Sequence, residues 1–286
     1  MDISLIQKIK SAVVGIGLID IKKDPGKGDF EIIAGSGFII DKVGVFITAT
    51  HVIANLLSKR KEFAEGGKQT QLSLFHFKEE TGHLFCRIMP FEEPGYITGT
   101  HIKSKEKYDL DIAVGKVFDS IGNLPYLEIA NKPTLNIFDE IFVCGYPGGK
   151  TTLNLKIGSL EGRTAPLIQY GRISGFIPTD NAEKPYGIQT DIIGTGGSSG
   201  SPIIEVKTGR VVGISQNVIG GNVFRKTEKG YSSFGITNVG MIYGVSSHAL
   251  SEVSSIVDAL KKGVKNVDLP VDFTYFKEGK FLKRPV

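Results

Sequence analysis

The chain consists mainly of short runs rich in valine and isoleucine, and each run ends a few residues later at a turn-forming sequence. For example, Asp24-Pro25-Gly26 separates the run at 13–21 from the run at 30–33. Further strands are predicted at 38–40, 45–48, 72–77, 85–89, 112–117, 140–144, 155–160, 186–190, 202–205, 211–214 and 240–245. Short strands at this spacing, with no long helices alternating with them, predict an all-β barrel or sandwich.

One long segment has the apolar spacing of an amphipathic helix rather than a strand. It runs from Ser247 to residue 262, and Gly263 is placed to cap its end. Its apolar face consists of Leu250, Val253, Ile256, Val257 and Leu260. We expect a surface helix packed on the β structure. The four aromatic residues of the tail, residues 263–286, favour docking of the tail on its own domain.

The first residues have some features of a signal peptide, because Lys8 and Lys10 precede an apolar run. However, Asp2 is acidic and no small-residue cleavage site follows the run. No apolar stretch is long enough to span a membrane. We therefore expect a short helical lead-in and a first strand, in a cytoplasmic protein that has no membrane partner.

The composition excludes several other classes. With 41% apolar and 22% charged residues the chain is an ordinary globular protein and not a disordered one. The net charge of +4 is spread along the chain, so nucleic acid is not an expected partner. Cys86 and Cys144 have no histidine at metal-ligand spacing, so we expect reduced thiols, no metal and no cofactor.

Three short motifs carry residues suited to chemistry. Ser199 lies in a stretch of glycines and serines, residues 196–202, where a tight turn would expose its hydroxyl beside free backbone N–H groups. His51 follows the strand at 45–48, where a carboxylate could fix its tautomer. Asp109 and Asp111 begin an alternating strand, and an inward carboxylate there needs a partner. Each motif alone is more often structural than functional.

Together the motifs appear in the order His, Asp, Ser, which differs from the Ser, Asp, His order of α/β hydrolases. The chain resembles a trypsin-like serine peptidase with the chymotrypsin fold, and in particular the HtrA (DegP-like) protease domain without a PDZ domain. The resemblance covers residues 11–262. It rests on segments that include Gly35-Ser36-Gly37-Phe38-Ile39-Ile40-Asp41, Ile47-Thr48-Ala49-Thr50-His51-Val52-Ile53, Asp111-Ile112-Ala113-Val114, Gly158-Ser159-Leu160-Glu161-Gly162-Arg163, Ile188-Gln189-Thr190-Asp191 and Val211-Val212-Gly213-Ile214.

The resemblance implies one peptidase domain, residues 1–262, and a separate tail. It implies two six-stranded antiparallel β-barrels, at about 11–120 and 135–246, and then the helix at 247–262. It also implies that Ser199 is the nucleophile, His51 the general base and Asp111, rather than Asp109, the residue that orients the imidazole. The N–H groups of Gly197 and Ser199 would form the oxyanion hole.

The resemblance also suggests where substrate binds. Ile193 and Gly194 would form one wall of the specificity pocket, and an apolar Ile193 favours a small or medium apolar P1 side chain over Arg or Lys. The opposite wall, which would pair with an extended substrate, would come from Ser215, Gln216 and Asn217. Ser198 stands where zymogens of this class have Asp, so activation by a cut N-terminus is not expected. The glycine-rich, basic insertion at 218–231 is either a surface loop or a gate.

The first function predicted is therefore a serine endopeptidase that cuts protein or peptide substrates and is controlled by an activating partner. The alternative is an inactive or conditionally active peptidase fold that binds peptides or regulates another protein. An α/β-hydrolase esterase would need a histidine near the C-terminus. Because the only candidate, His248, begins a helix, this third function is disfavoured.

Overall fold

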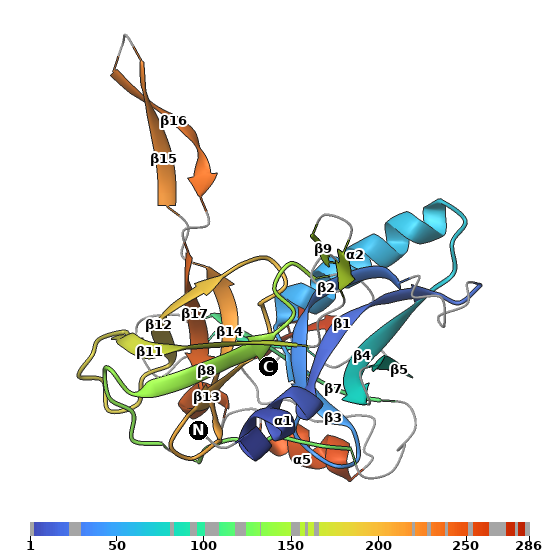
Figure 1. Cartoon of the computed structure of the whole chain (residues 1–286), viewed down its shortest axis with the longest axis horizontal. Helices are drawn as coiled ribbons and strands as arrows, with labels where there is room; N and C mark the ends of the chain where they lie inside the picture. Colours follow the sequence, from blue (N-terminus) through green and yellow to red (C-terminus); the bar gives the residue numbers. More distant parts are fainter. Residues whose placement is uncertain are drawn as a thin grey trace.

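A computed structural model of the chain describes residues 3–22, 30–80, 83–91, 96–100, 109–117, 124–131, 133–149, 155–157, 160–162, 166–218, 221–227, 230–237, 240–250, 254–262, 273–277 and 280–283. Most of these residues are in strands, as the sequence predicts. Figure 1 shows the strands in two groups side by side, with helices α1 (Ile3–Ala12) and α5 (Ser254–Lys261) lying along one side of the molecule.

The N-terminal half of the chain and two strands from the C-terminal tail form one large sheet with the strand order β19-β18-β6-β7-β3-β2-β1-β4-β5. Its strands are β1 (Val13–Asp20), β2 (Phe30–Ile39), β3 (Val45–Thr48), β4 (Thr70–Glu80), β5 (His83–Pro90), β6 (Tyr96–Thr100), β7 (Asp109–Lys116), β18 (Phe273–Lys277) and β19 (Lys280–Lys283). The sheet therefore has nine strands where the resemblance implied six. The difference arises partly because β18, from the C-terminal tail, pairs with the free edge of β6.

The C-terminal half forms a closed six-stranded barrel with the order β11-β12-β17-β14-β13-β8, as expected. Its strands are β8 (Glu140–Gly145), β11 (Leu167–Ile177), β12 (Gly187–Gly194), β13 (Pro202–Glu205), β14 (Val211–Val218) and β17 (Gly240–Ser246). Alternate side chains point inward and fill the barrel, including Ile141, Val143, Ile173, Ile188 and Ile203.

Two of the four described helices correspond to the sequence prediction at 247–262. They are α4 (Ser247–Leu250) and α5, and residues 251–253 between them lie outside the described part. The predicted lead-in is α1, in which Ile9 and Ala12 are fully buried. The sequence analysis was wrong to expect no other long helix, because α2 (Thr50–Glu65) follows β3 directly. Within the described ranges, no helix combines the length and apolar character needed to cross a membrane.

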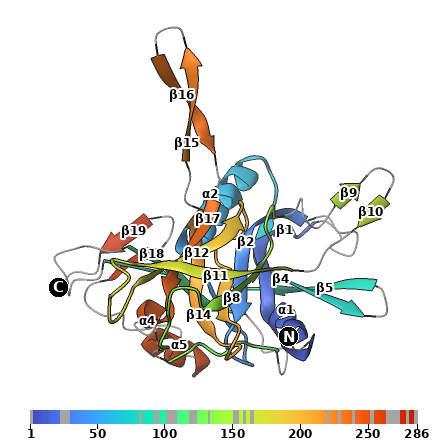
Figure 2. The same ribbon diagram turned by 60° about the vertical axis from the view of Figure 1, so that its left-hand side comes forward.

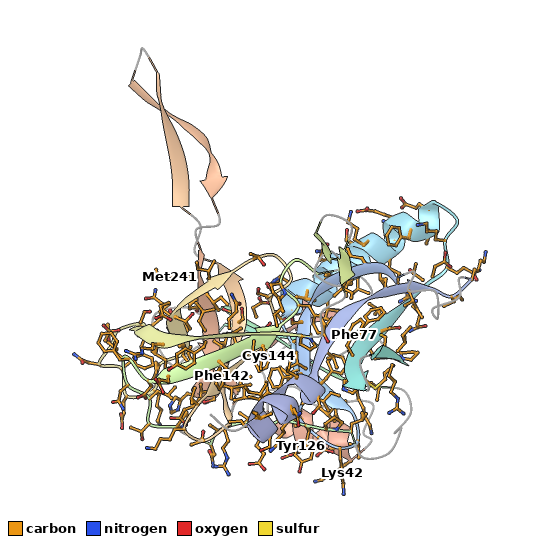
Figure 3. All side chains as sticks on the ribbon, viewed as in Figure 1. Lys42, Phe77, Tyr126, Phe142, Cys144 and Met241 are labelled. Atoms are coloured by element: carbon orange, nitrogen blue, oxygen red, sulfur yellow. The ribbon has the colours of Figure 1, made fainter. Side chains whose placement is uncertain are left out.

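The two halves share a hydrophobic core. The rings of Phe77, on β4, and Tyr146, directly after β8, lie 5.6 Å apart between their centroids. Both side chains belong to one buried cluster that draws members from each half of the chain. Figure 3 labels Phe77, Cys144 and Phe142, three members of this cluster.

The insertion after β14 is a β-hairpin and not an irregular loop. Its strands, β15 (Gly221–Thr227) and β16 (Gly230–Thr237), pair with each other in a separate two-stranded sheet. Figures 1 and 2 show the hairpin projecting away from the body of the molecule. A second small sheet joins β9 (Leu155–Ile157) and β10 (Leu160–Gly162).

Candidate active site

His51 is the second residue of α2, and not the end of a strand as the sequence suggested. The residue before the helix is Ala49, which offers no side chain to cap the free N–H groups of the first turn. The His51 N–H instead donates to Asp111 Oδ1 at 2.9 Å. Asp111 therefore caps α2, and the positive end of the helix dipole favours its carboxylate.

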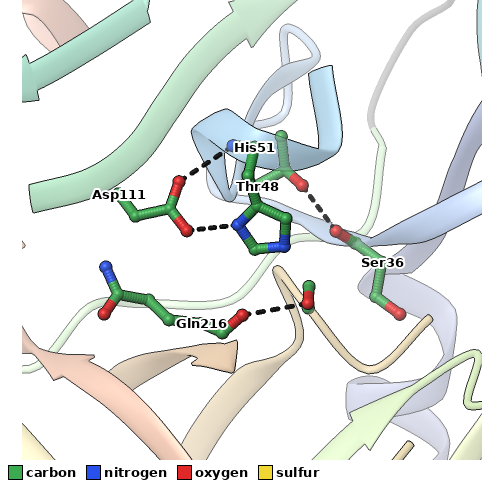
Figure 4. Close-up of polar contacts among 6 residues, drawn as sticks. Ser36, Thr48, His51, Asp111 and Gln216 are labelled. Carbon is green, nitrogen blue, oxygen red and sulfur yellow. Dashed lines mark hydrogen bonds and ion pairs between the residues drawn. The ribbon is translucent and has the colours of Figure 1, made fainter. Parts of the chain in front are cut away.

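The second oxygen of Asp111 binds the imidazole of the same histidine. Asp111 Oδ2 and His51 Nδ1 form a short hydrogen bond, drawn in Figure 4. Because a carboxylate only accepts hydrogen bonds, this contact places the proton on Nδ1 and leaves the lone pair of the neutral ring on Nε2. The site thus holds an imidazole in the tautomer required of a general base.

Strand pairing explains why these two residues meet. In β7, Ala113 pairs with Thr48, the last residue of β3, which leads through Ala49 into α2. Asp111 lies two residues before Ala113 and so reaches the first turn of the helix. Asp109 pairs with Thr100 one step further along β7. Of the two carboxylates that the sequence left in competition, the imidazole binds Asp111.

Ser199 lies on a tight loop between β12 and β13. Its Oγ donates to the backbone oxygen of Gln216, on β14, at 2.9 Å (Figure 4). The hydroxyl is therefore engaged with β14 and not with His51 in this structure. Gly200 N also bonds to β14, donating to Ser215 O at 2.7 Å.

The same loop packs against the segment that carries His51. Gly200 has φ +84°, and a Cβ built there would lie 2.0 Å from Ser36 O and 2.4 Å from Thr48 Oγ1. A Cβ on Gly35 would meet both Val52, in the first turn of α2, and Ser199 O. These close approaches need glycine, and they bring the serine loop beside the start of α2.

Within the described residues, three N–H groups of the serine loop have no protein acceptor, those of Gly196, Gly197 and Ser199. The N–H groups of Ser198, Gly200 and Ser201 all donate to backbone oxygens. The N–H groups of Gly197 and Ser199, separated by one bonded N–H group, are suited to bind an oxyanion.

The residues expected to bind substrate lie on β12 and β14, which both pair with β17. Ile193 pairs with Met241 across β12 and β17, and Gly194 pairs with Gly240. The Ile193 side chain is 65% exposed, and the backbone oxygen of this residue accepts a hydrogen bond from Gln169 Nε2 at 2.8 Å. The sequence analysis had not singled out Gln169, because nothing in the sequence places it beside residue 193.

The other predicted binding segment is part of β14. Ser215 and Gln216 are buried, and Asn217 pairs with Tyr243 on β17. The pairing of β14 with β13 ends at Ile214, so 215–218 lie beyond the end of β13. Burial, with a contribution from the Tyr186 phenol, raises the pKa of Tyr243 to about 12.

The sequence analysis expected no metal. Among the residues that the structure describes, no group of three or more His, Cys, Asp or Glu side chains is arranged to hold a metal ion. Burial raises the pKa of the Cys144 thiol well above its ordinary value, so this thiol stays protonated.

The protein thus combines a β-sheet and a β-barrel with a His51–Asp111 pair beside a serine loop. This combination is that of the chymotrypsin class of serine peptidases. Residues 35–214 match the family described as "Trypsin-like peptidase domain". Because this match spans more than half of the sequence, the chain belongs to the trypsin-like peptidase family.

Individual relatives agree with this assignment. A "Probable periplasmic serine endoprotease DegP-like" of Hahella chejuensis is 30% identical over 185 residues, which are 64% of this chain and 29% of that protein. "Protease Do-like 5, chloroplastic" of Arabidopsis thaliana is 28% identical over 75% of this chain and 59% of its own length. The chain thus spans less than two thirds of each of these relatives.

Among solved structures, a serine endoprotease from Yersinia pestis superposes with a TM-score of 0.50 and 19% sequence identity. The superposition covers 92% of this chain and 69% of that one. At this identity the likeness concerns the fold alone.

Proposed function

We propose that the protein is a serine endopeptidase that cuts protein or peptide substrates through an acyl-enzyme intermediate. The observation that carries this proposal is the His51–Asp111 pair, which holds an imidazole with Nε2 free beside the Ser199 loop. In this mechanism Ser199 Oγ attacks the scissile carbonyl, and His51 accepts its proton and later gives it to the leaving amine. Asp111 holds the imidazole, while the N–H groups of Gly197 and Ser199 bind the developing oxyanion.

The first step requires a change at the nucleophile. The Ser199 hydroxyl now donates to Gln216 O, and it must turn toward His51 Nε2 before the proton can be transferred. This step includes rotation about the Cα–Cβ and Cβ–O bonds of the Ser199 side chain. Such motion takes nanoseconds or less in exposed side chains.

A fluorophosphonate probe tests the proposal. We expect covalent labelling of the wild type and no labelling of Ser199→Ala, while Ser174→Ala, at an exposed serine of β11, labels like the wild type. Comparison of protein N-termini in cells with wild type or Ser199→Ala should show new termini that depend on Ser199. An absence of labelling and of such termini would contradict the proposal.

We also propose that the substrate binds as an extended strand along 215–217 of β14, with a small or medium apolar P1 residue. The position of this segment beyond the end of β13 supports the first part, and the apolar Ile193 supports the second. Cleavage of a peptide library tests both. Strict cleavage after Arg or Lys would rule out the predicted P1 preference.

A second candidate is an inactive or conditionally active peptidase fold that binds peptides or regulates a partner. The hydrogen bond from Ser199 to Gln216 O favours it, because the nucleophile is turned away from its base at rest. Peptide binding without fluorophosphonate labelling under any condition would support this candidate. Labelling that appears only with an added protein partner would support conditional activity.

The cytoplasm is the proposed compartment. The burial of Ile9 and Ala12 in the protein core supports this, because α1 is then packed as part of the folded domain. Fractionation of the native cells, with the N-terminus of the purified protein sequenced, tests this proposal. A mature protein that begins after α1 and is found outside the cytoplasm would overturn it.

A further inference from the structure

Ser36, on β2, is fully buried and joins three parts of the molecule. Its N–H donates to Ser199 O at 2.8 Å, and its Oγ donates to Gly197 O at 2.7 Å. The same Oγ accepts the N–H of Tyr146, which follows β8, at 2.8 Å. Its backbone oxygen accepts from Thr48 Oγ1 at 2.6 Å, the contact drawn in Figure 4.

These contacts bear directly on the free N–H groups of the serine loop. Ser36 holds the carbonyl oxygens of Gly197 and Ser199, the two residues whose N–H groups are suited to bind an oxyanion. Each peptide unit is planar, so the hydrogen bond to the Gly197 oxygen fixes the orientation of the peptide unit between Gly197 and Ser198. Gly148 N donates to Gly196 O at 2.5 Å. This bond fixes the orientation of the peptide unit between Gly196 and Gly197, which carries the Gly197 N–H. The Gly197 N–H is thus fixed from both sides.

The backbone of Gly197 has little intrinsic preference for the conformation that it adopts. Its φ is +93°. Glycine adopts positive and negative φ about equally readily, so its own preference for this φ is weak. The surroundings are tightly packed, since a Cβ on Gly145 would lie 2.0 Å from Ser201 Oγ and 2.7 Å from Ser36 Oγ.

We infer that Ser36 is a positioning residue for the oxyanion hole: it ties the oxyanion loop of the barrel to the N-terminal half that carries His51 and Asp111, and so aims the N–H groups of Gly197 and Ser199. The inference rests on the proposed peptidase function. Ser36 touches no reacting atom, and it acts only through the two carbonyl groups that it holds.

The test compares Ser36→Ala with Ser73→Ala, which removes another fully buried serine hydroxyl, on β4 of the same sheet. We expect Ser36→Ala to lower kcat for a peptide ester by roughly 10- to 100-fold, because misplacing an oxyanion donor acts on the transition state. KM should change less than about threefold, since uniform substrate binding is untouched. Ser73→Ala should leave both constants near the wild-type values.

A second measurement separates positioning from general damage. In a thionoester the oxyanion is replaced by a larger sulfur anion that accepts hydrogen bonds weakly, so the ratio of ester to thionoester kcat reports the oxyanion hole. We expect this ratio to fall in Ser36→Ala by about the same factor as kcat, and to stay unchanged in Ser73→Ala. If Ser36→Ala does not fold, Ser36→Cys, which is slightly larger and keeps only a weak donor, is measured in the same way.

Crystal structures of the wild type and the variant test the inference without activity. We expect the Gly197 carbonyl to turn away from β2 in Ser36→Ala and the Gly197 N–H to leave its wild-type direction. A folded Ser36→Ala with unchanged kcat, or with an unchanged oxyanion loop, would overturn the inference. If the wild type lacks activity, the proposed function fails, and the crystal structures still decide what Ser36 does.

Discussion

At the scale of single residues, the carboxylate of Asp111 makes two different hydrogen bonds to His51, one with each oxygen. Oδ1 caps the first turn of α2 and Oδ2 holds the imidazole of His51. The sequence could not choose between Asp109 and Asp111 by alternation, because residues two apart point to the same face of a strand. The resemblance favoured Asp111, and the pairing of β7 with β3 supplies the physical reason.

Asp111→Asn tests this double role. The Asn oxygen can still accept the His51 N–H, but its NH2 group cannot accept a proton from Nδ1, so the imidazole takes the wrong tautomer. We expect kcat to fall by about 10³- to 10⁴-fold, with little change in melting temperature. Asp109→Asn, two residues earlier on β7, is the control and should lose less than about tenfold. Equal losses in the two variants would contradict the assignment.

Gly35 illustrates how packing sets the distance between the serine loop and α2. A Cβ at this position would lie 2.6 and 2.7 Å from the Val52 methyl groups and 3.0 Å from Ser199 O. We expect Gly35→Ala to lower kcat at least tenfold, measured with a peptide ester, because the loop is pushed away from His51. The double variant Gly35→Ala/Val52→Ala removes both methyl groups and should recover part of the loss. Gly66→Ala, whose added Cβ would make only ordinary contacts at 3.4 and 3.7 Å, should have no effect.

The raised pKa of Tyr243 predicts a loss of stability at high pH. The pKa is about 12 in the folded protein and about 10 in an unfolded chain, so folding disfavours the phenolate. The stabilising contribution is complete below pH 10 and is lost as the pH rises through 12. In urea unfolding, the free energy of unfolding should fall more steeply between pH 10 and 12 for the wild type than for Tyr243→Phe. Tyr126→Phe, at an exposed tyrosine, should keep the wild-type slope.

At the scale of elements, the sequence missed α2 and β11 for different reasons. The apolar residues 45–48 run on into Val52 and Ile53, so the start of α2 reads as the end of a strand. In β11, Gly171 and Gly175 interrupt the apolar pattern. They occupy places where a Cβ would strike Asp191 Oδ1 at 2.3 Å and approach Gln189 Oε1 at 3.0 Å. In both elements a tertiary contact outweighs the local pattern.

Because the β15–β16 hairpin projects from the molecule, we expect that it can be removed without loss of stability in the remaining domain. In the described part of the chain β15 and β16 pair only with each other, while β14 and β17 stay joined through Val218 and Ile242. Replacing residues 219–239 with a short Asn-Gly turn should leave the melting temperature within a few degrees of the wild type. Fluorophosphonate labelling of Ser199 should persist. A folded variant that no longer labels would show that the hairpin shapes the site.

At the scale of the whole molecule, the site lies where two β structures meet, and each supplies part of it. The N-terminal half provides His51, on α2, and Asp111, on β7 of the sheet, while the barrel provides Ser199 and β14. One hydrophobic cluster, with Phe77 from the sheet and Phe142 from the barrel, crosses the boundary. The relative position of the two halves is therefore set by the same core that stabilises both.

This shared core predicts a single cooperative unfolding transition. Far-UV circular dichroism and tyrosine fluorescence should give the same midpoint in urea, since the chain has no tryptophan. Phe46→Ala, which removes a fully buried ring from the sheet alone, should cost about 3–5 kcal/mol and shift both signals together. Phe138→Ala, at an exposed ring, should shift neither. Two separate midpoints would show that the halves unfold independently.

The sequence by itself determined the strand-rich class, the order of His51, Asp111 and Ser199, and the glycines of the serine loop. These depend on residue type and on neighbours along the chain, which a sequence records. Only the tertiary structure decided that His51 lies in the first turn of a helix, that the imidazole binds Asp111, that the tail strand β18 pairs with β6, and that Ser36 binds the Gly197 carbonyl of the serine loop. Each of these depends on a contact between residues far apart in the chain, and such contacts are fixed by packing rather than by local pattern.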